Sequence, residues 1–154
     1  MNNIDNICTQ LKALNHLYMR QDKIYHRFAQ NAGLSDSAFW ILYTMFESGE
    51  PITQIGFCEA CFISKQTINS SINVLAKKGY VILEPIAGTK NSKSVSLTDD
   101  GISFCREYIQ PVLNAERTAF ENFTENERKT FITLMERQLN YLNEAATTEK
   151  EYLL

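Results

Sequence analysis

The feature that most constrains this chain is a short helix-like segment near its middle, residues 64–78. It is followed by Gly79 and then by two strand-like segments. Within it Ile68, Ile72 and Leu75 recur at helical spacing and predict one buried face. Ser64 is a favourable N-cap residue. Gly79 fits the left-handed position that commonly follows the end of a helix. The pattern therefore predicts a helix followed directly by a β-hairpin.

The opposite face of this segment carries short amides and hydroxyls, whereas an ordinary solvated helix surface holds mostly Glu, Lys and Arg. Amides pair with adenine, hydroxyls bond to base edges and phosphates, and no carboxylate is present to repel DNA. We interpret this face as a DNA-recognition surface, with a plain solvated surface as the alternative. The predicted DNA contacts in this segment and the hairpin are Ser64, Lys65, Gln66, Thr67, Asn69, Ser70, Asn73, Lys77, Lys90, Asn91 and Lys93.

The net charge of −3 would argue against nucleic acid if it were evenly distributed. Between Phe62 and Thr98, however, the chain carries five lysines and one glutamate, which gives this segment +4 and leaves −7 for the remainder. Such a division is expected when one segment contacts phosphate and the rest stays solvated, although surface lysines are common in proteins of every class.

The chain before this segment predicts three helices. A long amphipathic helix begins near the N-terminus and ends near Gly33. A second helix, rich in aromatic residues, is capped by Ser35 and stops at Gly49. A third, short helix is expected over residues 53–61.

The chain after the segment predicts a hairpin and two more helices. Residues 80–84 and 93–97 alternate as strands do. A helix capped by Thr98 is expected to continue through Tyr108 and Ile109 despite Pro111. The last helix should open with the capping box Thr124-Glu125-Asn126-Glu127.

The length of 154 residues and the hydrophobic content of 44% fit one folding unit with a single good core. No apolar run is long enough to cross a bilayer, and the N-terminus lacks the pattern of an export signal, so we expect a cytoplasmic protein without a membrane partner. No P-loop, dinucleotide-binding glycine motif, HExxH motif or nucleophile–base arrangement is present. We therefore expect no enzyme activity, no cofactor and no metal site.

The run SKQTINSSINVLAKKGYV, the hairpin after it and the run VSLTDDG resemble the MarR family of bacterial regulators, and the resemblance covers nearly the whole chain. It implies a mostly α fold with a small β-hairpin wing. Residues 35–98 would form a winged helix-turn-helix, and residues 1–34 and 99–154 a helical dimerisation region, in one intertwined folding unit. The family usually has an Asp-Arg-Arg-like wing motif where this chain reads Thr89-Lys90-Asn91-Ser92-Lys93. Weaker or rearranged wing contacts are therefore expected.

The function implied by the resemblance is that of a homodimeric transcriptional repressor that binds a pseudo-palindromic operator in duplex DNA. The family also implies a pocket for a small-molecule effector between the dimer helices and the winged domain. Aromatic and histidine side chains can stack on or bond to a phenolic ligand. The candidate effector residues are His16, Tyr18, His26, Trp40 and Tyr43, with ordinary core packing as the alternative for each.

The cysteines Cys8, Cys58, Cys61 and Cys105 are interpreted first as reduced, buried, small apolar residues. Cys58 and Cys61 are also candidate redox residues, since C-x-x-C spacing can support a disulfide or half of a zinc site. Cys8 is a third candidate through the resemblance alone, because some MarR relatives sense peroxides through a cysteine in the first helix. No second C-x-x-C is present to complete a zinc site. Two other functions stay open: a winged helix that binds proteins instead of DNA, and a thiol redox protein that uses Cys58 and Cys61.

Overall fold

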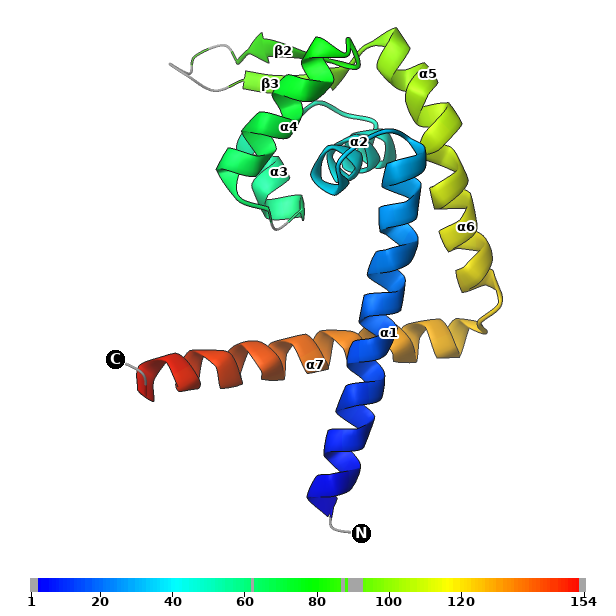
Figure 1. Ribbon diagram of the computed structural model, residues 1–154, viewed down its shortest axis with the longest axis vertical. Helices are drawn as coiled ribbons and strands as arrows, with labels where there is room; N and C mark the ends of the chain where they lie inside the picture. The colour runs from blue at the N-terminus through cyan, green and yellow to red at the C-terminus, as the bar shows by residue number, and fades with distance from the viewer. Residues whose placement is uncertain (1–2, 62, 87, 89–92, 153–154) are drawn as a thin grey trace. The chain divides into compact units, whose positions relative to one another are not determined.

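The computed structural model describes residues 3–61, 63–86, 88 and 93–152. It is mostly helical with one small antiparallel sheet, which confirms the predicted fold class (Figure 1). The chain forms two compact units, Met1–Val112 and Leu113–Leu154. The elements in chain order are α1 (Asn3–Asn31), α2 (Asp36–Ser48), β1 (Ile52–Thr53), α3 (Gln54–Cys61), α4 (Lys65–Lys77), β2 (Val81–Pro85), β3 (Lys93–Leu97), α5 (Asp99–Tyr108), α6 (Gln110–Glu121) and α7 (Glu125–Tyr152).

The core of the first unit lies where α2, α3 and α4 pack against one another, with the hairpin beside them (Figure 1). Apolar side chains from all three helices are completely removed from solvent there: Phe39, Ile41, Leu42, Phe57, Ile68, Ile72 and Leu75. Large buried side chains of this kind each stabilise the fold by about 1.5–3 kcal/mol relative to exposure. The position of α4 is therefore fixed by burial of its inner face.

The sheet has the strand order β1-β3-β2, and both pairs are antiparallel. Val95 is buried in the central strand, opposite Ile52 on one side and Leu83 on the other. The third helix was expected to start at Thr53, which is wrong by one residue because Ile52 and Thr53 extend to pair with β3. Thr53 instead accepts a hydrogen bond from the Gly56 N–H at 3.0 Å, at the start of α3.

The predicted helix starts at four positions are confirmed by side-chain capping. Ser35 accepts from the Ala38 N–H. Ser64 and Thr98 accept from the third residue of their own helices. At the start of α7, Thr124 and Glu127 bond reciprocally, with the Thr124 N–H 2.8 Å from Glu127 Oε2 and the Glu127 N–H 3.3 Å from Thr124 Oγ1. This is the expected capping box, and its hydrogen bonds lower the pKa of the Glu127 carboxyl.

The helix expected to run from Thr98 past Pro111 is in fact two helices, α5 and α6, which meet at Ile109. That expectation was wrong because proline has no N–H to donate to the carbonyl four residues earlier and its ring crowds that carbonyl. Ile109 is fully buried at the junction and accepts from the Val112 N–H at 2.9 Å. Pro111 is instead the second residue of a new helix, where a missing N–H costs little.

The two longest helices expose much of their apolar surface. In the first unit, α1 leaves Ile4, Ile7, Leu11, Leu17 and Ile24 between 46% and 71% exposed. In the second unit, the aromatic rings of Phe120, Phe123 and Phe131 gather at the α6–α7 turn, but Leu134, Leu139 and Leu142 on α7 remain more than half exposed. Within the described ranges, no helix is long and apolar enough to cross a membrane.

Candidate nucleic-acid interface

The outer face of α4 is exposed, as predicted from the sequence. Ile68, Ile72 and Leu75 are 0% exposed on the inner face. Six of the predicted contact residues on this helix are exposed on the other side: Lys65, Gln66, Thr67, Ser70, Asn73 and Lys77. The helix therefore presents a row of amides, hydroxyls and lysines that contains no carboxylate, which is the composition expected of a surface that reads base edges.

Within this row the hydroxyls also serve the helix itself. Ser64 Oγ lies 2.9 Å from Thr67 Oγ1, and Ser70 Oγ donates to the Thr67 carbonyl at 2.9 Å. Because these short side chains are already held by local bonds, the longer Gln66 and Asn73 are the side chains best placed to donate and accept toward a partner.

Asn69 differs from its predicted place on the outer face, because it is half-buried. Its Oδ1 atom is buried, and no hydrogen-bond partner reaches it among the described residues. Residue 69 lies at the border of the face formed by Ile68 and Ile72, where helical spacing alone does not separate inside from outside.

A polar contact that the sequence did not reveal ties α4 to α2. Ser71 is 5% exposed, and its hydroxyl lies 2.8 Å from the hydroxyl of Ser37. Ser37 in turn lies 3.3 Å from the Ser35 hydroxyl, which caps α2. A part-buried hydroxyl pair is costly to separate, since both groups would lose their partner. It therefore fixes the rotation of α4, and with it the direction of the outer face.

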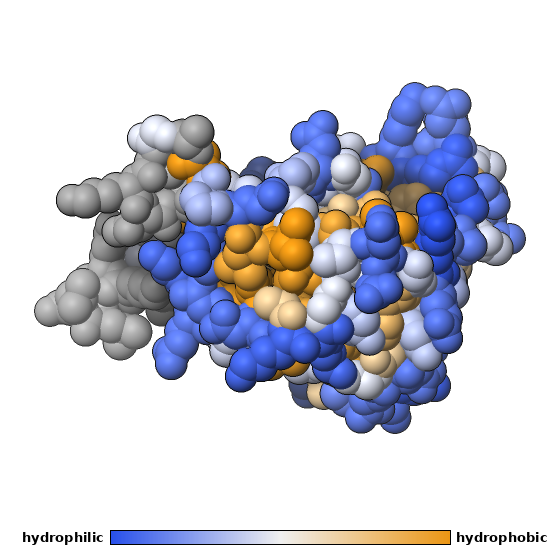
Figure 2. Space-filling model, turned by 90° about the horizontal axis from the view of Figure 1, so that it is seen from above, coloured by the Kyte–Doolittle hydropathy of each residue, from blue (hydrophilic) through white to orange (hydrophobic). Residues whose placement is uncertain are grey.

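The hairpin beside α4 provides one exposed lysine, Lys93 at the start of β3, opposite Pro85. Lys90 and Asn91, also predicted as DNA contacts, lie outside the described residues. Seen from above, hydrophilic residues cover most of the face of the molecule and surround a central apolar patch (Figure 2).

The end of α4 and the start of α5 are joined by hydrogen bonds around Thr98. Its Oγ1 donates to the Gly79 carbonyl at 2.6 Å and accepts from the Gly101 N–H at 3.0 Å. Its N–H donates to the Tyr80 carbonyl at 3.1 Å. The ring of Tyr80 also stacks on Phe104, with centroids 4.3 Å apart. We name the set Gly79, Tyr80, Thr98, Gly101 and Phe104 the Thr98 junction.

The predicted effector residues do not gather at one place. Trp40 and Tyr43 stack edge-on, with centroids 5.1 Å apart, and line a cavity of about 390 Å³. His26 instead pairs with Asp36 through its Nδ1 atom at 2.8 Å, between the end of α1 and the start of α2. His16 is exposed and Tyr18 half-buried on α1.

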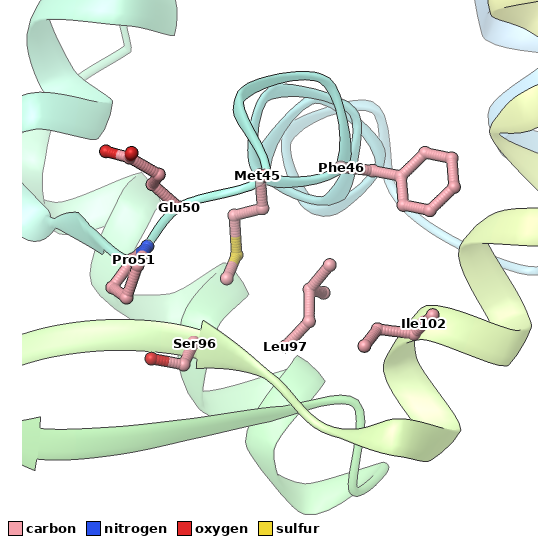
Figure 3. Close-up of a pocket in the computed structure, with 8 residues that line it drawn as sticks. Met45, Phe46, Glu50, Pro51, Ser96, Leu97 and Ile102 are labelled. Carbon is pink, nitrogen blue, oxygen red and sulfur yellow. The ribbon is translucent and has the colours of Figure 1, made fainter.

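A second cavity, of about 350 Å³, lies between the end of α2, the end of β3 and the start of α5. The side chains of Met45, Leu97 and Ile102 converge on it, while the Glu50 carboxylate points away from them (Figure 3). Its size falls in the range of small-molecule sites. Sequence reasoning missed this cavity because its walls come from three elements that are far apart in the chain.

The four cysteines differ in burial, and none is in a disulfide. Cys105 is 0% exposed, Cys58 and Cys61 are half-buried on α3, and Cys8 is exposed on α1. The interpretation of every cysteine as buried is therefore wrong for Cys8. Burial raises the pKa of the Cys105 thiol to about 12, because the ionised form is poorly solvated there.

We expect Cys105 to resist a thiol reagent such as dithionitrobenzoate in the folded protein, because only the thiolate reacts and burial suppresses it. Cys8 should react fastest, as it is exposed. Peptide mass spectrometry after timed labelling identifies each site. Rapid labelling of Cys105 without denaturant would contradict the packing of α5.

Comparisons with known proteins agree with this geometry. A model of the MarR family matches residues 32–90, which include α2, α3, α4 and β2. The chain is similar to the HTH-type transcriptional regulator PecS of Dickeya dadantii (strain 3937), with 27% identity over 123 residues that cover 79% of this chain and 72% of that protein. It is also similar to the HTH-type transcriptional repressor YetL of Bacillus subtilis (strain 168), with 23% identity over 125 residues that cover 80% and 71%.

Solved structures share the fold. The MarR family regulator NMB1585 from Neisseria meningitidis matches with a TM-score of 0.69 and 20% identity, over 97% of this chain and 99% of that one. MepR of S. aureus, in a DNA-binding conformation, matches with a TM-score of 0.73 and 16% identity, over 86% and 98%.

The matched segment contains α4, the helix that carries most of the candidate interface. The curated relatives of the chain are transcriptional regulators and not enzymes. The resemblance noted from the sequence is thereby confirmed. Residues 32–90 match the MarR family, and the chain as a whole is similar to winged helix-turn-helix, DNA-binding transcriptional regulators of that family.

Proposed function

We propose that the chain acts in the cytoplasm as a homodimeric repressor that binds a pseudo-palindromic operator and is modulated by an effector. The observation that carries this proposal is the outer face of α4, which exposes Gln66, Asn73 and flanking lysines and contains no carboxylate. The part-buried Ser37–Ser71 pair holds that face in one orientation. A preorganised polar row of this kind is what direct reading of a major groove requires.

The homodimer is supported by the exposed apolar residues of α1 and α7. Leu11 and Leu17 on α1 and Leu134 and Leu139 on α7 are each about half exposed. Contiguous apolar surface on long helices is stabilised when a second copy covers it, and a two-fold dimer is the commonest arrangement. Two copies would then present their α4 helices to successive major grooves, about 34–36 Å apart.

Modulation by a small molecule is supported by the cavity that Met45, Leu97 and Ile102 line. Leu97 directly precedes Thr98, so this cavity adjoins the Thr98 junction. A ligand that prefers one arrangement of these residues would change the population of the arrangement that binds DNA. Release of the operator by an apolar effector is the direction we propose.

The proposal is tested by measuring binding to DNA flanking the protein's own gene at several salt concentrations. Binding should weaken steeply with salt, since counterions leave the phosphates when lysines approach them. Lys93→Ala should weaken binding to every sequence and reduce the salt slope by about one per subunit, or about two for the dimer. Lys12→Ala, which removes an exposed lysine on α1, is the control and should leave the slope unchanged.

Weak retention that depends neither on sequence nor on Lys93 would contradict the proposal. It would favour the second function left open by the sequence, a winged helix that binds a protein partner. The acidic net charge of −3 is the feature that supports that alternative.

A further inference from the structure

We propose that Cys58 and Cys61 form a binding site for one soft, two-coordinate metal cation of the Cu(I) type. The two thiols lie three residues apart on α3, and therefore on the same side of the helix. Both residues are half-buried, and neither is in a disulfide. The inference concerns metal binding alone and does not depend on DNA binding.

The spacing of the two thiols fits a bridging metal better than a disulfide. Residues three apart on a helix have their Cβ atoms about 5–6 Å apart. A disulfide needs a Cβ–Cβ distance of about 3.5–4.5 Å. Closing one would distort the last turn of α3, which ends at Cys61. Two metal–sulfur bonds of about 2.3 Å, the length of zinc–thiolate bonds, span the larger gap without that distortion.

The number of available ligands determines which kind of ion fits. Over the described part of the chain, no group of three or more His, Cys, Asp or Glu side chains gathers into a metal site. Structural zinc takes four ligands, and calcium and magnesium take more oxygen ligands than this pair offers. Thiolates select soft ions such as Cu(I). A pair of sulfurs without further ligands therefore fits a two-coordinate soft cation.

The charges around the thiols favour metal binding over peroxide chemistry. The last turn of α3 contains no basic residue, and the C-terminal end of a helix is partially negative. Glu47 lines the same cavity as Cys61. A thiolate that attacks a peroxide is activated by positive neighbours, whereas a cation brings its own positive charge. On binding, the two thiols release two protons and form two sulfur–metal bonds, so no oxidant is consumed.

The cavity beside Cys61 offers an ion a route of entry. It also places a fluorescent side chain, Trp40, near the thiol. Cys61 Sγ lies 3.5 Å from Thr44 Oγ1, so the thiol is directed toward α2. Cys61 and Trp40 line the same cavity of about 390 Å³. Trp40 is the one tryptophan of the chain. A heavy ion held at Cys61 is therefore expected to quench the fluorescence of the whole protein.

The test titrates reduced Cys8→Ser protein without oxygen, because the exposed Cys8 thiol would bind soft ions by itself. Ag(I) is the first probe, and Cu(I) follows in competition with a coloured chelator. One ion per chain should bind with quenching of Trp40 fluorescence. Adding Cys58→Ser or Cys61→Ser should weaken binding by more than about 100-fold, since loss of a direct ligand exceeds the effect of losing an outer partner.

Two measurements keep folding separate from binding. Thermal unfolding followed by circular dichroism shows whether each serine variant retains the fold. In Cys8→Ser protein with no other change, bound Ag(I) should protect Cys58 and Cys61 together from iodoacetamide. Undiminished binding by the folded serine variants, or alkylation of both thiols at the same rate with and without Ag(I), would overturn the proposal. A protein that binds no Ag(I) but forms a Cys58–Cys61 disulfide in dilute peroxide would also overturn the proposal. That result would favour thiol redox chemistry.

Discussion

Gly101→Ala is expected to lower the free energy of unfolding by about 3 kcal/mol or more, at the upper end of the range for a single substitution. A Cβ atom at residue 101 would lie 2.0 Å from the carbonyl oxygen of Tyr80 and 2.9 Å from its carbonyl carbon. These are backbone atoms, and the same oxygen accepts from the Thr98 N–H. The clash therefore cannot be relieved without opening the Thr98 junction. Urea denaturation of the variant and the natural protein measures the difference.

Gly33→Ala is the matched control for this substitution. Gly33 has φ +64°, and a Cβ there would meet nothing within 4 Å. Its expected cost is the strain of a left-handed alanine, about 1–2 kcal/mol. A loss at Gly101 no larger than the loss at Gly33 would show that the junction tolerates an extra carbon, and would contradict the close approach of α5 to Tyr80.

The second large effect is expected for the double variant Gln66→Ala and Asn73→Ala. Each amide that bonds to a base edge contributes about 1–3 kcal/mol of discrimination. Preference for the operator over unrelated DNA should therefore fall by about 100-fold or more. The salt slope should stay the same, because neither change removes a positive charge. Competition binding with operator and scrambled duplexes of equal length measures both quantities.

Gln30→Ala is the control for the double variant, since it removes an exposed amide on α1 outside the winged helix. It should leave discrimination unchanged. At the extreme, the double variant should bind operator and scrambled DNA with equal affinity and keep its non-specific binding. Full discrimination by a folded double variant would mean that other residues read the operator.

Features that depend on neighbouring residues were predictable from the sequence. Ser64, Thr98 and Thr124 cap their helices because the capping bond joins residues two or three positions apart. The inner face of α4 followed from the spacing of Ile68 and Ile72. The predicted interface on α4 rested on the same periodicity, and six of its residues are exposed there.

Features that depend on contacts between distant segments were not predictable. The pairing of Ile52 with Val95 joins residues far apart in the chain, so β1 was missed and α3 was started one residue early. Pro111 is compatible with either the first turn of a helix or a kinked interior, and the sequence did not decide between them. The hydroxyl pair of Ser37 and Ser71 depends on how α2 packs on α4.

The Thr98 junction has a thermodynamic consequence for the assembled regulator. The same hydrogen bonds fix the exit of α4 at Gly79 and the first turn of α5 at Gly101, so neither helix shifts without the other. Coupling between two sites is reciprocal. Whatever repositions α5 changes the affinity for an operator, and the operator acts back on α5 by the same factor. Under the function proposed above, operators with different half-site spacings would therefore act as effectors in their own right.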